Sequence, residues 1–137
     1  ARVAQTLTGS LDVGDIARRI VGSVLPVLRA RSSGFRLVQP DGSLIVIAEG
    51  QAGGAHSPYG HVVPPGCGVT GRAVADGLPV VTADVLGDSR ILLPEDMRSR
   101  VEASGLGALL AVPLRVQARI IGALSIADRT GATRAES

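Results

Sequence analysis

The chain has 137 residues, of which 45% are hydrophobic and 19% charged, and its formal net charge is +2. This length and hydrophobicity predict one folded domain with a hydrophobic core and argue against a disordered chain. No apolar run approaches the roughly 20 residues needed to span a bilayer, and no signal peptide is recognisable, so we expect no membrane segment. We expect a single domain over residues 1–137. Because the chain lacks an initial methionine, we expect it to be a piece of a longer protein.

The charged and aromatic residues argue against nucleic acid as a partner. All fourteen basic residues are arginines, and they form no basic run. Phe35 and Tyr59 are the only aromatic residues, which leaves almost nothing for bases to stack on. Cys67 is the single cysteine, so an internal disulfide is impossible and a reducing compartment fits. With only two histidines beside it, a conventional zinc site would need carboxylates. We predict no metal and no cofactor.

An amphipathic helix is predicted over residues 12–30. Apolar residues recur there at i+4 spacing, and Asp12 and Asp15 suit the N-terminus of a helix. Pro26 bends this helix or ends it early, because an interior proline removes a backbone hydrogen bond.

A β-hairpin is predicted next. Residues 34–39 and 44–49 read as strands, and the second is a continuous apolar run suited to burial on both faces. The turn sequence Pro40-Asp41-Gly42-Ser43 joins them. Residues 50–60 read as a glycine-rich loop, and residues 61–63 as a short edge strand.

Four glycines lie within the twelve residues from Gly66 to Gly77. Glycine is used where the backbone takes a positive φ or approaches another backbone closely. The stretch predicts a tight loop that leads into a short helix over residues 68–76, which Gly77 ends.

The second half predicts three more strands and a helix. Residues 79–82 read as a strand and residues 83–93 as a loop. A helix begins with Pro94 as its first residue and ends at Gly105, with Met97 on its buried face. Two long strands, 108–115 and 119–128, form an antiparallel hairpin, and Pro113 indicates an edge position or a bulge. This order predicts an α+β domain with an antiparallel sheet.

At three places the sequence resembles the GAF domain family. The segment from Gly66 to Val80 is similar to the family's central G-x-G-V-x-G-R-A-V-x-x-G-x-P-V signature. Asp84 to Arg90 resembles its D-x-x-x-D-P-R loop, with Ser89 where proline is common. The last predicted hairpin resembles the family's closing strands, V-P-L followed by G-x-x-x-G-x-L. The resemblance covers roughly residues 7–130.

The resemblance implies a GAF-like, PAS-related fold, with a central antiparallel sheet of five to six strands flanked by helices. It implies a ligand pocket on one face and terminal helices on the other. The helix over residues 12–30 would then contribute to a homodimer. The family's long C-terminal helix would be missing or incomplete, because the chain ends at Ser137.

Four residues are candidates for ligand binding: Asp84, Arg90, His61 and Met97. A carboxylate and a guanidinium at a pocket rim give orienting contacts to a polar ligand. The alternative is that Asp84 caps loop amides and that Arg90 pairs with Asp88 to hold the loop.

The favoured function is a non-enzymatic sensory or regulatory domain of a cytoplasmic bacterial signalling protein that binds an unknown small ligand. The main alternative is a structural dimerisation module without a ligand. A haem sensor with His61 as axial ligand, ahead of His56, is a lesser alternative. So is an enzyme like the free methionine sulfoxide reductases, but Thr70 occupies the place of one of their cysteines and no second thiol exists.

Overall fold

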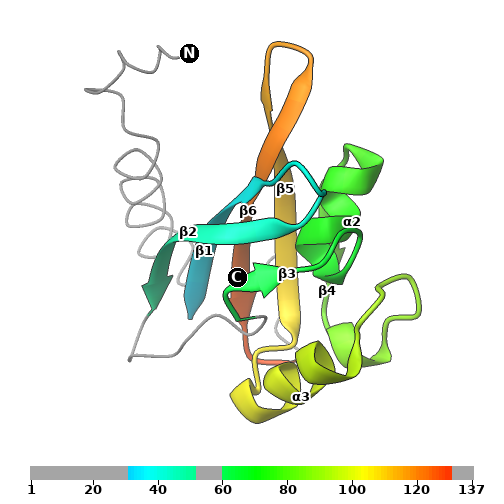
Figure 1. Cartoon of the computed structure of the whole chain (residues 1–137). Helices are drawn as coiled ribbons and strands as arrows, with labels where there is room; N and C mark the ends of the chain where they lie inside the picture. Colours follow the sequence, from blue (N-terminus) through cyan, green and yellow to red (C-terminus); the bar gives the residue numbers. More distant parts are fainter. Residues whose placement is uncertain (1–30, 52–59, 131–137) are drawn as a thin grey trace.

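The computed structural model describes residues 31–51 and 60–130, in which six strands form one sheet (Figure 1). All pairings are antiparallel, and the spatial order is β3-β2-β1-β6-β5-β4. The predicted α+β fold with its antiparallel sheet is therefore confirmed. The strands are β1 Ser32–Val38, β2 Leu44–Gln51, β3 Val62–Val63, β4 Val80–Thr82, β5 Ala108–Val116 and β6 Arg119–Asp128.

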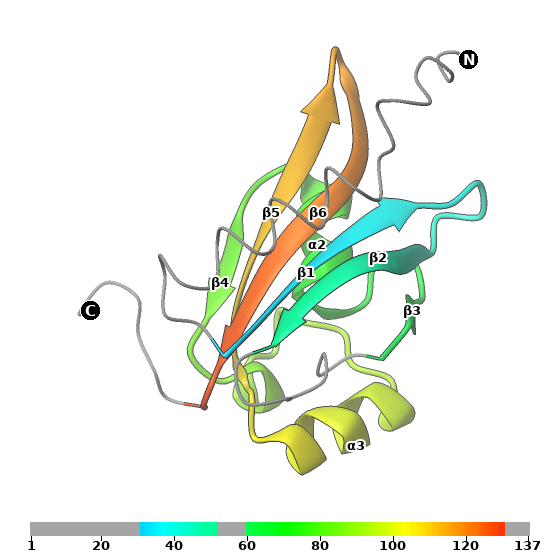
Figure 2. The same cartoon turned by 90° about the vertical axis from the view of Figure 1, so that its left-hand side faces the viewer.

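Two helices and one 3-10 turn complete the described part of the chain. They are α2 Gly68–Asp76, α3 Glu95–Ser104 and the turn η2 Val85–Gly87. Both helices lie on the same side of the sheet (Figures 1 and 2). Neither is long and apolar enough to cross a membrane. The predicted helix over residues 12–30, most of the loop 50–60 with His56, and the tail after residue 130 lie outside the described residues.

The turn between β1 and β2 forms as its sequence predicts. The amide of Gly42 donates to the carbonyl of Gln39, and the amide of Gln39 donates to Ser43, each at 2.8 Å. Asp41 accepts hydrogen bonds from the amide of Ser43 at 2.9 Å and from its hydroxyl at 2.6 Å. A short polar side chain that bonds the backbone two residues ahead stabilises such a turn.

The glycine-rich stretch forms the predicted tight loop and short helix. A Cβ on Gly71 would lie 2.7 Å from the carbonyl carbon of Gly66, so this first turn of α2 packs against the loop too closely for any side chain. Gly77 ends the helix with a φ of 71°, and its amide donates to the carbonyl of Ala73 at 2.8 Å. The loop and the helix are thus held together by backbone contact.

Three prolines lie close to their predicted positions. Pro94 is the N-cap of α3, one residue earlier in the helix than predicted, and Glu95 and Asp96 occupy the first turn. β4 begins at Val80, just after Pro79. Pro113 lies in the part of β5 that extends beyond β4, because β4 pairs only with residues 109–111 of β5. Its missing amide hydrogen therefore breaks no ladder between these two strands.

The sheet has an apolar core on its helix-covered face and a smaller cluster on the opposite face. The main core joins Leu44 and Val63 to residues of α2, α3 and β5. On the other face Phe35 and Ala48 pack with half-buried leucines and Ile47. β2 was predicted to be buried on both faces, but residues 45–47 are only half-buried. Among the described residues, β2 is covered on its outer side only by the two-residue strand β3.

Candidate functional site

The loop that follows β4 borders an open depression of about 460 Å³. The described residues that line it come from the end of β4, from η2 and from the residues after it: Thr82, Asp84, Gly87, Asp88, Ser89 and Arg90. This places two of the four candidate residues, Asp84 and Arg90, around one depression. The depression is open to solvent on its outer side.

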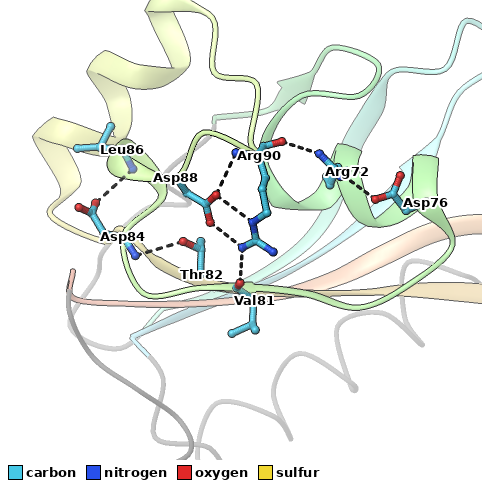
Figure 3. A network of polar contacts seen from close by, with 8 residues as sticks. All are labelled: Arg72, Asp76, Val81, Thr82, Asp84, Leu86, Asp88 and Arg90. Atoms are coloured by element: carbon cyan, nitrogen blue, oxygen red, sulfur yellow. Dashed lines mark hydrogen bonds and ion pairs between the residues drawn. The ribbon is translucent and has the colours of Figure 1, made fainter.

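Asp88 holds the side chain of Arg90 through two hydrogen bonds (Figure 3). The Arg90 Nε donates to Oδ1 at 3.0 Å, and Nη2 donates to Oδ2 at 2.6 Å. Nη2 also donates to the carbonyl of Val81 at 2.9 Å, at the free edge of β4. This fork-to-carboxylate geometry fixes the direction of the guanidinium.

Asp84 caps the 3-10 turn with one of its carboxylate oxygens. Its Oδ1 accepts from the amide of Leu86 at 3.2 Å, and its own amide donates to the hydroxyl of Thr82 at 3.3 Å. The structural roles foreseen as alternatives for Asp84 and Arg90 are therefore both present. Each side chain nevertheless keeps one polar atom available. Asp84 Oδ2 and Arg90 Nη1 make no hydrogen bond to any residue in the described part of the chain.

Two further arginines tie the loop to the helices. Arg72 of α2 donates to the carbonyl of Arg90 at 2.7 Å and pairs with Asp76 at 2.5 Å (Figure 3). Arg98 of α3 donates to the carbonyl of Leu86 at 3.2 Å. The depression thus rests on a loop that is anchored to β4, α2 and α3. Such anchoring holds the polar groups around the depression in fixed positions.

The ion pair of Asp88 and Arg90 predicts a pH dependence of stability. Hydrogen bonds from the Arg90 guanidinium, together with that of the Thr82 hydroxyl, hold the pKa of Asp88 well below its usual range. A carboxyl group whose pKa is depressed by folding stabilises the protein above its unfolded pKa of about 4, and this contribution is lost as pH falls toward the folded pKa. We expect Asp88→Asn to be less stable than the wild type at pH 7 and to approach it below about pH 3.

Urea unfolding at several pH values measures this difference. Asp41 needs a parallel variant, Asp41→Asn, because hydrogen bonds from Ser43 also lower its pKa. Asp41 lies in the β1–β2 turn, away from Asp88, so each variant measures the contribution of one carboxylate to the pH dependence of stability. An Asp88→Asn protein whose stability differs from that of the wild type by the same amount at pH 7 and at pH 3 would contradict the role of this ion pair.

The other two candidate residues lie on different elements and do not line the depression. His61 precedes β3 and is exposed, while its backbone carbonyl accepts from the amide of Val46 at 3.0 Å. Met97 is 1% exposed and belongs to the main core under α3.

Cys67 is a buried thiol at the N-terminus of α2. It is 4% exposed, and its Sγ donates to the carbonyl of Pro65 at 3.6 Å. Burial raises the pKa of this thiol, and the negative charge of Asp96 adds to the effect. A thiol with a raised pKa is a poor nucleophile at neutral pH.

Two buried polar side chains were not foreseen. Arg36 is 1% exposed and donates to backbone carbonyls at the start of β3. Thr70 of α2 is fully buried, and its hydroxyl has no hydrogen-bond partner among the described residues. The strand pattern around Arg36 indicated only that it faces away from Phe35 and Leu37, and arginine is rarely interior.

Comparison with known proteins identifies the family. A family model described as "GAF domain" matches residues 10–136. No curated protein sequence matches the chain.

Solved structures share the fold at low sequence identity. Free methionine-R-sulfoxide reductase from Neisseria meningitidis, in complex with its substrate, is 20% identical with a TM-score of 0.71, over 94% of this chain and 71% of that one. The GAF domain of an Acinetobacter phosphoenolpyruvate-protein phosphotransferase is 13% identical with a TM-score of 0.67, over 96% and 75%. The phycocyanobilin-bound GAF domain of a cyanobacterial phytochrome is 21% identical with a TM-score of 0.67, over 96% and 79%.

Proposed function

The chain belongs to the GAF domain family, and on this basis we propose that it is a non-enzymatic sensory or regulatory domain that binds a small polar ligand. The observation that carries the proposal is the depression beside η2, where Asp88 orients Arg90 and Asp84 keeps one carboxylate oxygen free. The parent protein would be a bacterial signalling protein in the cytoplasm. The domain would form a homodimer through the helix predicted over residues 12–30.

The charges of the depression set the kind of ligand that it fits. The side chain of Arg90 is 55% exposed and that of Asp88 14%, so the guanidinium faces the solvent while its partner is largely covered. A ligand with an acidic group would bond the free Nη1 of Arg90, and a donor group on the same ligand would bond Asp84. The combination favours a small molecule that carries both kinds of group over a purely apolar one.

Signal transmission would use the anchored loop. A ligand changes a conformational equilibrium only by binding one state better than the other. Because Arg72 and Arg98 join this loop to α2 and α3, a ligand that draws Arg90 toward itself would alter the contacts of both helices. In this proposal the change reaches an output module through the terminal helices.

The non-enzymatic part of the proposal rests on Cys67. Some structural neighbours are methionine sulfoxide reductases, so the alternative function is an enzyme of that kind. Thiol-based reduction needs an attacking and a resolving thiol, and this chain has one cysteine. That cysteine is buried with a raised pKa. A haem sensor is not favoured either, because the side chain of His61 is exposed and an axial ligand needs an enclosed apolar pocket.

A structural dimerisation module is the second candidate, and Met97 favours it. Its side chain fills the core beneath α3 together with Val101, so that these side chains leave no room for a ligand there. Under this reading the ion pair of Asp88 and Arg90 only holds the loop. The two candidates differ in whether any small molecule stabilises the fold.

Thermal unfolding with a panel of amino acids, nucleotides and small organic acids tests the proposal. A ligand at 100 times its Kd adds about 2.7 kcal/mol to the stability of the folded state, which raises Tm by several degrees. We expect at least one compound to do so and Arg90→Ala to abolish the shift.

The matched control is Arg115→Ala. Arg115 is also an exposed arginine bonded to a backbone carbonyl, that of Gly77 at 2.9 Å, but it lies near the end of β5, beyond the residues that pair with β4. The control should keep the shift. If no compound raises Tm, or if the shift survives Arg90→Ala, the structural module is the better account.

A further inference from the structure

Arg36 is an arginine in the interior of a small domain. It is 1% exposed and is the largest of the fully buried side chains among the described residues. It lies on β1, where its register partners are Ala123 of β6 and Val46 of β2. Its neighbours Phe35 and Leu37 pack on the opposite face, so Arg36 points to the face that carries α2 and α3. A charge in such a place is retained only with strong hydrogen-bond partners.

The guanidinium of Arg36 donates hydrogen bonds to the backbone just before β3. Nη1 donates to the carbonyl of His61 at 3.0 Å, and Nη2 donates to the carbonyl of Gly60 at 2.5 Å. The side chain of Arg100 of α3 also lies close to Gly60, since a Cβ on Gly60 would be 3.2 Å from its Cζ. Gly60 therefore lies next to side chains from both β1 and α3.

β3 has few contacts of its own to keep it in the sheet. It has two residues, it lies at the edge, and within residues 31–51 and 60–130 it pairs only with β2. Val63 is fully buried opposite Leu44, but Val62 is 51% exposed. A short edge strand with so few backbone bonds opens at a lower free energy than the sheet centre. What holds its beginning therefore decides how often it opens.

We propose that β3 opens separately from the rest of the sheet and that Arg36 is the latch that closes it. The hydrogen bonds to Gly60 and His61 run from one guanidinium on β1 to backbone carbonyls just before β3, so they tie the beginning of β3 to the middle of the sheet. Buried ionic groups often add little net stability, and positioning or switching is their best-attested use. Arg36 is thus a positioning residue for β3.

The latch connects to the depression through a short stretch of chain. β3 leads into Cys67, the N-cap of α2, and Cys67 forms a parallel bridge with Leu92. The amide of Gly68 also donates to the carbonyl of Leu92 at 2.9 Å. Leu92 lies two residues after Arg90. Opening of β3 would therefore shift the loop that carries Arg90, and this second step rests on the proposed function.

Hydrogen exchange of Arg36→Met tests the latch without any ligand. The reporter is the amide of Val46, which bonds the carbonyl of His61 and is freed when β3 opens. We expect this amide to exchange at least ten-fold faster in Arg36→Met, while the amide of Ile126 in the centre of the sheet changes less than three-fold. The matched control is Arg115→Met, which removes an arginine-to-carbonyl bond of 2.9 Å elsewhere and should leave Val46 unchanged.

Two results would overturn the latch: an unchanged Val46 amide, or an equal acceleration of Val46 and Ile126. If Arg36→Met does not fold, the wild type still decides. In low urea the Val46 amide of the wild type should exchange through an opening whose free energy is lower than that of global unfolding. If the two free energies are equal, the proposal is overturned.

The step to the depression has its own readout. A compound that raises Tm through Arg90 should change the exchange of Val46 at least three-fold, and no change would refute the connection between depression and latch. If no compound binds, the proposed function is contradicted. The latch is still tested in that case, because the Arg36→Met comparison needs no ligand.

Discussion

Gly122→Ala is expected to destabilise the domain by about 3 kcal/mol or more, or to prevent folding. A Cβ at this position would lie 2.1 Å from the carbonyl oxygen of Arg36 and 3.4 Å from the Cα of Leu37. Both contacts are with backbone in the middle of the sheet, where β1 and β6 pair in register. The clash can be relieved only by moving the two strands apart, because a close-packed interior has no free volume nearby.

Urea and thermal unfolding measure this loss, which corresponds to a fall in Tm of roughly 10 °C. Gly34→Ala is the matched control, since Gly34 lies on the same strand pair and its Cβ would meet only ordinary contacts at 3.8 Å. It should change stability by less than about 1 kcal/mol. Equal stability of Gly122→Ala and Gly34→Ala would contradict the close approach of β1 and β6.

Met97→Ala is expected to cost about 2–5 kcal/mol, the range for truncating a buried side chain to alanine. Met97 is 1% exposed and packs in the main core with Val101 of the same helix. Removing its side chain leaves a cavity that α3 can fill only in part. Chemical unfolding measures the loss.

Leu92→Ala is the control for Met97, because Leu92 is 63% exposed and its truncation should cost less than about 1 kcal/mol. A loss below about 1 kcal/mol for Met97→Ala would mean that this side chain borders open space. Such a result would return Met97 to the candidate ligand-binding residues and would move the pocket beneath α3.

Local patterns predicted most of the described fold. The turn at residues 40–43 and the helix ends at Gly77 and Gly105 follow from conformations that few residues adopt, with φ near 70° at both helix-ending glycines. Pro94 was placed one position too far inside its helix, because proline is accepted both before and at the first helical residue. Boundaries of this kind depend on tertiary contacts.

The site was only partly predictable, because it combines local and distant contacts. Asp84 and Arg90 are six residues apart in one loop and line the same depression, and a sequence motif can reveal such a local pair. His61 and Met97 belong to other elements, and a motif carries no information about their distance from the loop. Arg36 was missed for a different reason. An arginine on an alternating strand is normally solvated, and only the three-dimensional structure reveals that the carbonyls of Gly60 and His61 accept hydrogen bonds from it.

The central claim is that a small polar ligand binds beside η2 and is held by Arg90. The most direct measurement is the change in amide chemical shifts when a compound that raises Tm is added to the ¹⁵N-labelled domain. The account predicts the largest changes in residues 82–90, with smaller changes at the start of β3. Saturable changes confined to other residues, or none with any compound, would contradict it.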